Sequence, residues 1–139
     1  MSAAANIDNA KNWAEAVMSG DLDRFDQLVT PIVLDHDPAP EQALGGATGF
    51  KAFFAMLREA FPDIRLSVEH MIAHEDAVAI AYRIEGTHRG TFAGVAPTGK
   101  RVSARGMQIA RYENGMMVER WGSSDGLGML EQIGAKITA

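Results

Sequence analysis

Apolar residues in the N-terminal half of the chain recur at the three- and four-residue spacing of helices. A first helix is predicted to end at Gly20, because glycine tolerates the left-handed backbone that often follows a helix. Asp21 is a suitable cap for a second, short helix, which Pro31 stops. After a brief extended segment, IVLDHD, a third helix is predicted, which Thr48 can cap and Pro62 ends. Its apolar face is unusually aromatic and carries Phe50, Phe53, Phe54, Leu57 and Phe61.

From Ile64 onwards apolar and polar residues alternate, which is the period of β-strands. Two strands are predicted on either side of the turn HEDA, and a third from about Arg101 to Tyr112. The pair Asn114-Gly115 is a hairpin signal, and the last strand ends near Trp121, before a short C-terminal helix, GLGMLEQIG. Helices followed by hairpin-connected strands predict an α+β fold. We expect a cone-shaped, curved antiparallel β-sheet that is closed by three N-terminal helices.

The composition is that of an ordinary globular protein, with 139 residues, 47% hydrophobic and 22% charged. This length predicts one domain over residues 1–139. No apolar run approaches the about 20 residues of a membrane span, and the start of the chain lacks the residue order of a secretory signal. The net charge of −5, with scattered basic residues, argues against a nucleic-acid partner. We therefore expect a cytoplasmic protein that binds neither membrane nor nucleic acid.

No metal site is predicted, because the chain has no cysteine and its histidines are poorly spaced. His70 and His74 lie on a predicted strand, where four residues span about 13 Å, too far for both side chains to reach one ion. The glycines at positions 86, 90, 94 and 99 lack the surroundings of a phosphate-binding loop and favour turns and bulges.

The stretch Gly122-Ser123-Ser124-Asp125-Gly126 fits the pattern G-x-S-x-G, in which Ser124 would be a hydrolase nucleophile. That motif requires a strand, turn and helix within a parallel sheet, with an acid and then a histidine later in the chain. Here the last histidine, His88, precedes Ser124. We therefore expect that Ser124 is not a nucleophile.

Asp125 has two possible roles that the sequence leaves open. As the cap of the C-terminal helix its carboxylate would accept backbone N–H groups and be a poor base. Alternatively, Trp121 and the aromatic helix face could line a shared cavity, where desolvation would raise the pKa of Asp125 towards that of a useful general base.

Several motifs together resemble the SnoaL-like polyketide (ester) cyclases of the nuclear-transport-factor-2-like superfamily. They are LDHDPAP, AFPDI, HEDAVAIAYRIEGTHRGTFAGVAPTGKRV, GMQIARYENGMMVERW and SSDGLGMLEQIG, and they cover roughly residues 30 to 134. The resemblance implies a cone-shaped barrel with three main helices that forms homodimers through the open sheet surface. It also implies intramolecular aldol condensation without metal or cofactor.

The resemblance further implies roles for individual residues. In the family an aspartate after the last strand removes a proton alpha to a carbonyl, and in this chain that role falls on Asp125. His36 corresponds to a polar position at the cavity mouth, where it could orient the carbonyl or donate a proton. Arg105 and Gln108 lie on opposite faces of one predicted strand, and Gln108 is the one expected to face the pocket. The expected substrate-binding residues are Trp121, His88, Gln108, Phe53 and Phe61.

The expected substrate is a small, apolar or aromatic polyketide-like molecule. Because a shared fold does not fix a reaction, two alternatives stay open. One is a non-catalytic small-molecule binding domain in which Asp125 only caps a helix; the other is an isomerase or dehydratase on the same fold.

Overall fold

Helices form where the apolar spacing predicts them, in a computed structural model that describes residues 3–136. α1 (Ala3–Ser19) ends at Gly20, whose φ is +82° and whose N–H donates to the Ala16 carbonyl. The second helix is a 3₁₀ turn (Leu22–Arg24) that continues into the short α2 (Phe25–Leu28). The first and second helices are therefore confirmed, and Asp21 occupies the N-cap position, but its side chain accepts no capping hydrogen bond.

The N-cap of α3 (Gly46–Ala60) is Gly45 and not Thr48 as predicted, so Thr48 lies in the first turn of the helix. Gly45 and Gly46 have φ values of +67° and +58°, a backbone that only glycine adopts without strain. They turn the chain into α3 directly after the 3₁₀ turn Pro40–Gln42. A fourth helix, α4 (Gly126–Gln132), follows the last strand as the sequence predicts.

The five strands form one mixed sheet in the order β1-β5-β4-β3-β2. β1 pairs in parallel with β5, and the other neighbours are antiparallel, so the expectation of a purely antiparallel sheet is wrong for its first strand. The chain reaches β1 from α2 and leaves it through α3, which forms a crossover instead of a hairpin. The strands are β1 (Val29–Asp35), β2 (Arg65–His74), β3 (Ala77–Thr87), β4 (Arg101–Glu113) and β5 (Met116–Ser124).

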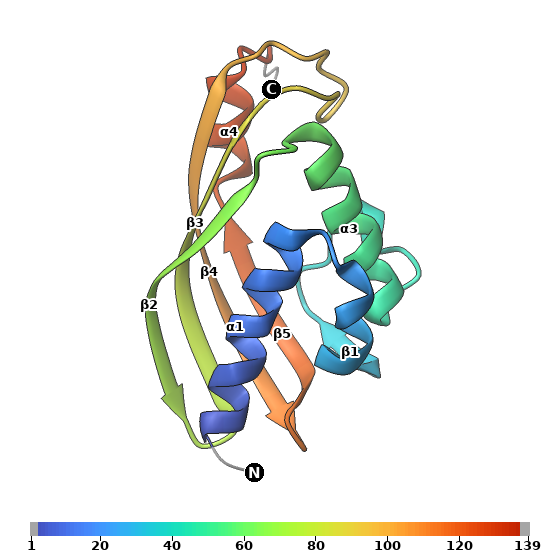
Figure 1. Ribbon diagram of the computed structural model, residues 1–139, viewed down its shortest axis with the longest axis vertical. Coiled ribbons are helices and arrows are strands. Elements are labelled where there is room, and N and C mark those ends of the chain that lie inside the picture. Colours follow the sequence, from blue (N-terminus) through green and yellow to red (C-terminus); the bar gives the residue numbers. More distant parts are fainter. Residues whose placement is uncertain (1–2, 137–139) are drawn as a thin grey trace.

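The sheet is curved and stays open, and α1 and α3 lie along its concave face (Figure 1). Bulges interrupt the β2–β3 pairing after Val68 and the β4–β5 pairing at Arg111, and such irregularities bend strands and increase their twist. The α+β class, the curvature and the three covering N-terminal helices are thus confirmed. No helix within residues 3–136 is long and apolar enough to cross a membrane.

Alternate residues of β4 separate the two faces of the sheet. Gln108 is buried and faces the helices, whereas Arg105 is exposed on the outer face, as the period of two predicts. The aromatic side of α3 packs into the core between helices and sheet. There Trp13 contacts three phenylalanine rings edge to face, at centroid distances of 4.7 Å to Phe25, 4.8 Å to Phe50 and 5.9 Å to Phe54.

Candidate active site

Three adjoining hollows lie between the helices and the concave face of the sheet, and we call them together the interior cavity. Phe53 and Ser124 line all three, which have volumes of about 70, 170 and 280 Å³. Their combined size falls in the range of about 300–1,000 Å³ that is usual for small-molecule sites. The helical wall is apolar and consists of Trp13, Val17, Phe50, Phe53, Phe54, Met56 and Leu57.

The sheet side of the cavity carries a hydrogen-bonded polar cluster centred on Arg120. Its Nε donates to Gln108 Oε1 at 2.7 Å, and its Nη1 donates to both carboxylate oxygens of Asp35 at 3.0 and 3.2 Å. Gln42 Nε2 donates to Asp35 Oδ2 at 2.9 Å. The side chains of Arg120 and Asp35 are only 15% and 9% exposed. Because the Asp35 carboxylate balances the charge of the guanidinium, the cluster has no net charge but can still donate hydrogen bonds to a ligand.

Two glycines on the concave face make room for long polar side chains. A Cβ at Gly122 would collide with Arg120 Nη2, and one at Gly106 would collide with the phenol of Tyr82. Tyr82, Gly106 and Ser124 are in register across β3, β4 and β5, so the Tyr82 ring crosses over Gly106 towards Ser124. Burial raises the pKa of Tyr82, while the charge of Arg120 and a hydrogen bond with the Ser124 hydroxyl partly oppose that rise.

Asp37 brings a second carboxylate to the interior cavity, in the same hollow as Arg120 and Gly122. Its Oδ2 accepts a hydrogen bond from the Gly122 N–H at 2.9 Å, and its own N–H donates to Asp35 Oδ1 at 3.0 Å. Unlike Asp35, Asp37 is exposed and forms no ion pair among the described residues. Like Glu41, it is therefore an exposed carboxylate of the cavity lining.

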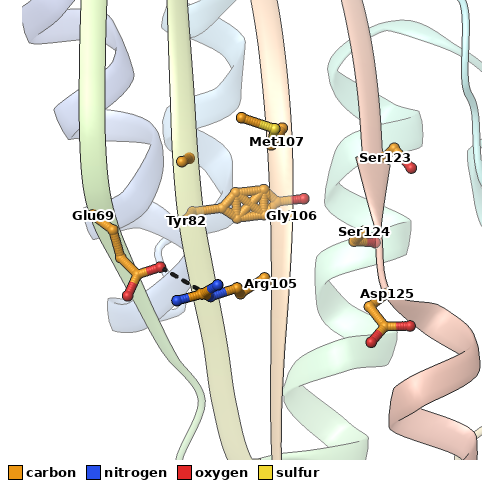
Figure 2. Close-up of a pocket in the computed structure, with 9 residues that line it drawn as sticks. Glu69, Tyr82, Arg105, Gly106, Met107, Ser123, Ser124 and Asp125 are labelled. Atoms are coloured by element: carbon orange, nitrogen blue, oxygen red, sulfur yellow. Dashed lines mark ion pairs between the residues drawn. The ribbon is translucent and has the colours of Figure 1, made fainter.

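Asp125 caps α4, as one of its two sequence interpretations predicts. Its Oδ1 accepts from the Gly128 N–H at 2.8 Å, and the residue is exposed. It does not line the interior cavity but a wide, open depression of about 690 Å³, whose lining includes Glu69, Arg105 and Met107 and shares Tyr82 and Ser124 with the interior cavity. Figure 2 shows this depression, with the Glu69–Arg105 ion pair on one side and Asp125 at the start of α4 on the other. The cap is thus confirmed, and a role as base stays a prediction.

Trp121 and His36 lie together on the outer face of the sheet, not in the interior cavity. Their rings stack at a centroid distance of 4.7 Å with an interplanar angle of 7°. His36 Nε2 is 2.7 Å from Glu119 Oε2, and Arg111 Nε donates to Glu119 Oε1 at 3.0 Å. These two contacts hold the pKa of Glu119 below its usual value. The prediction that Trp121 lines a cavity around Asp125 is therefore wrong. His36 does not lie at the mouth of the interior cavity.

His88 and Phe61 are fully buried where β3 ends, and neither lines the interior cavity. The Thr98 N–H donates to His88 Nδ1 at 3.2 Å, which ties the two ends of the connection between β3 and β4 together. Phe61 packs against Phe92 of that connection at 5.2 Å. Of the five predicted substrate-binding residues, the structure thus brings only Gln108 and Phe53 into the cavity.

The sequence interpretation missed several polar residues that line the cavity or complete its polar cluster, among them Asp35, Asp37, Gln42, Tyr82 and Arg120. The alternation of β3 marks Tyr82 as one of its inward residues, so this signal was available. Across residues 3–136, no group of three or more histidine, aspartate or glutamate side chains is arranged to hold a metal ion.

Several solved structures share the fold, and three of them are Streptomyces proteins. IdmH from Streptomyces antibioticus, a candidate polyketide cyclase, is 28% identical, with 94% of this chain and 99% of IdmH covered and a TM-score of 0.81. AclR from Streptomyces galilaeus, a candidate hydroxylase, is 27% identical, with 96% and 98% covered and a TM-score of 0.82. TsrD from Streptomyces laurentii shares the fold at 23% identity, with 98% and 99% covered and a TM-score of 0.87.

The comparison with curated proteins finds no match. The model of the SnoaL-like polyketide cyclase family matches residues 8–133, a span that includes all five strands, α4 and the whole interior cavity. The chain therefore belongs to the SnoaL-like polyketide cyclase family.

Proposed function

We propose that the protein is a cofactor-independent enzyme that closes a ring in a polyketide-like substrate by intramolecular aldol condensation. The observation that carries this proposal is the neutral cluster of Arg120, Asp35 and Gln108 inside an apolar cavity of a SnoaL-like domain. A base removes a proton alpha to a carbonyl, the C–H electron pair forms the C=C bond of the enolate, and the carbonyl π pair moves to oxygen. The enolate carbon then attacks a second carbonyl of the same molecule, and the new alkoxide takes up a proton.

The cavity favours a substrate that is mostly apolar and rich in neutral carbonyl groups. Trp13, Phe53 and Phe54 offer aromatic surface to a flat, conjugated ligand. The Arg120 guanidinium keeps Nη2 for a ligand oxygen, since Nε and Nη1 are bound to Gln108 and Asp35. Because Asp35 already neutralises Arg120, a ketone or ester oxygen suits the cluster better than a carboxylate.

We propose Asp37 as the general base of this reaction. Its carboxylate shares a hollow with Arg120, so a carbonyl bound at Arg120 would have its alpha carbon near Asp37. The Gly122 N–H bound to one carboxylate oxygen fixes its direction and leaves the other oxygen for the proton. The competing proposal, which rests on the family resemblance, gives this role to Asp125, whose second oxygen is not used by the cap.

The function is tested by proton exchange at the alpha carbon of a diketo-ester probe in deuterated buffer. We expect enzyme-dependent deuterium incorporation and a cyclised product, both detected by mass spectrometry. Binding of the probe without any exchange would overturn the enzyme proposal in favour of a binding domain. Exchange with a rearranged or dehydrated product, but no ring, would favour the isomerase or dehydratase alternative.

Asp125→Asn separates the two candidate bases. Asparagine caps helices about as well as aspartate, so the free energy of unfolding should change by less than about 1 kcal/mol. With Asp37 as base, the exchange rate should stay within a few-fold of wild type. A folded Asp125→Asn protein that loses a factor of about 10² to 10⁴ would instead assign the base to Asp125, as the resemblance implies.

We also propose that the protein forms a homodimer through the outer face of its sheet. That face exposes large apolar side chains on three neighbouring strands, and such patches usually mark interfaces. They are Ile32, Leu34, Met107, Ile109 and Trp121, of which Ile32 is 88% and Met107 is 66% exposed.

The dimer prediction is checked by light scattering. Wild type should give about twice the 15.0 kDa mass of one chain, and Ile109→Lys should give a monomer because it buries a charge in the interface. Leu44→Lys is the matched control, since Leu44 is exposed but lies outside the sheet. A wild-type protein of 15.0 kDa at tens of micromolar would refute the dimer.

A further inference from the structure

Tyr82 stands out because it lines both the interior cavity and the open depression that holds Asp125, while the residue is almost completely buried. The residue is 8% exposed and lines the same hollow as Gln108, Arg120 and Ser124. Figure 2 shows its ring extending from β3 past Gly106 towards Ser124. The Tyr82 hydroxyl belongs neither to the apolar helical wall nor to the hydrogen bonds of the Arg120 cluster.

The position of the phenol is set by the backbone of three strands. Tyr82 pairs with Gly106, and Gly106 pairs with Ser124, so the three residues form one row across the sheet. Any side chain at position 106 would occupy the space of the Tyr82 hydroxyl. The ring therefore lies against the floor of the cavity with little freedom to move, which suits a donor that must be in place before the reaction.

The phenol is a proton-bearing donor under ordinary conditions. Burial raises its pKa, so Tyr82 stays neutral near pH 7 and keeps its O–H. The Ser124 hydroxyl can donate to the phenol oxygen, which leaves the phenol O–H for a ligand. The nearby charge of Arg120 makes negative charge more favourable at this place.

We infer that Tyr82 is a further catalytic residue of the reaction proposed above, the donor that stabilises the enolate. As the base takes the alpha proton, the C–H electron pair forms the C=C bond of the enolate and the carbonyl π pair moves onto oxygen, which accepts a hydrogen bond from the Tyr82 O–H. The Tyr82 proton stays on Tyr82, so no extra acid is consumed. Ser124 is a positioning residue, which acts on the substrate only through the phenol.

The test compares Tyr82→Phe with Tyr112→Phe in the deuterium exchange of the diketo-ester probe. Removing one donor to a developing oxyanion costs about 10² to 10³ in rate, so kcat for Tyr82→Phe should fall by that factor while KM stays within a few-fold. Tyr112→Phe is the matched control, because Tyr112 is a buried tyrosine of the same sheet that does not line the interior cavity. Ser124→Ala should give a smaller loss of kcat, again with little change in KM.

A binding series keeps this inference separate from the proposed reaction, on which it rests. Naphthols of decreasing pKa imitate an enolate with increasing negative charge on oxygen. The affinity of wild type should rise as the naphthol pKa falls, and Tyr82→Phe should remove that rise. Ser124→Ala should make the rise smaller. It serves as the second variant if Tyr82→Phe does not fold.

The outcomes of the two measurements are distinct. Exchange in wild type with an undiminished rate in Tyr82→Phe would overturn the role of Tyr82 alone. A wild-type protein without exchange would overturn the proposed reaction, and the naphthol series would then decide whether Tyr82 is the anion-stabilising donor. An equal dependence of affinity on naphthol pKa in wild type and Tyr82→Phe would refute the role of Tyr82 as that donor.

Discussion

Asp37→Asn is expected to lower the rate of alpha-proton exchange by a factor of about 10² to 10⁴, the usual contribution of a general base. The variant keeps the size of the side chain and an oxygen that can accept from the Gly122 N–H. The amide nitrogen that replaces the other carboxylate oxygen cannot take up the proton. Probe affinity, measured by fluorescence titration, should stay near wild type because Arg120 and the apolar wall are untouched.

The matched control for this experiment is Asp23→Asn, which removes a carboxylate that is 91% exposed and far from the cavity lining. Its exchange rate should equal that of wild type. A folded Asp37→Asn protein with a normal exchange rate would exclude Asp37 as the base. A loss confined to Asp125→Asn would then identify the carboxylate on the other side of the sheet.

Asp35→Ala is expected to have the largest effect on stability, a loss of about 3 to 5 kcal/mol in the free energy of unfolding. The side chains of Asp35 and Arg120 are 9% and 15% exposed, so removing the carboxylate leaves a guanidinium with little access to water. Gln42 also loses its acceptor. Urea denaturation monitored by circular dichroism measures the change.

Two further variants show whether the unpaired charge is the cause. Asp35→Ala combined with Arg120→Met should recover much of the lost stability, because replacing both partners removes the uncompensated ion. Asp26→Ala should cost less than about 1 kcal/mol, since its pair with Lys51 is exposed. A loss in Asp35→Ala no larger than that of Asp26→Ala would show that the Arg120 cluster contributes nothing to the fold.

Local signals were sufficient to predict most helices and strands. Glycine at position 20 and proline at position 62 set helix ends, and strict alternation in β4 separated Gln108 from Arg105. The parallel pairing of β1 with β5 could not be predicted in this way, because it joins segments that are about 85 residues apart and depends on how α3 crosses the sheet. Asp35 reaches Arg120 only through that pairing.

One extra residue in β5 explains why the polar cluster was missed. Met117 pairs with Tyr112 and Glu119 pairs with Arg111, which leaves Val118 without a partner in β4. A bulge of this kind shifts the strand by one residue, so every later side chain changes face. Unbroken alternation from the buried Met117 would turn Trp121 inward, whereas the structure turns Arg120, Gly122 and Ser124 inward.

The separation of apolar and polar lining between helices and sheet has a consequence for protein engineering. Three polar groups of the proposed site, on Tyr82, Gln108 and Arg120, stand on three neighbouring strands whose spacing is fixed by the sheet, and the proposed base Asp37 follows β1 of the same sheet. The side chains that limit the size of a bound ligand belong to α1 and α3, and are chiefly Trp13 and Phe53. Libraries randomised at these two helix positions should therefore change which substrates are accepted while the reaction itself is retained.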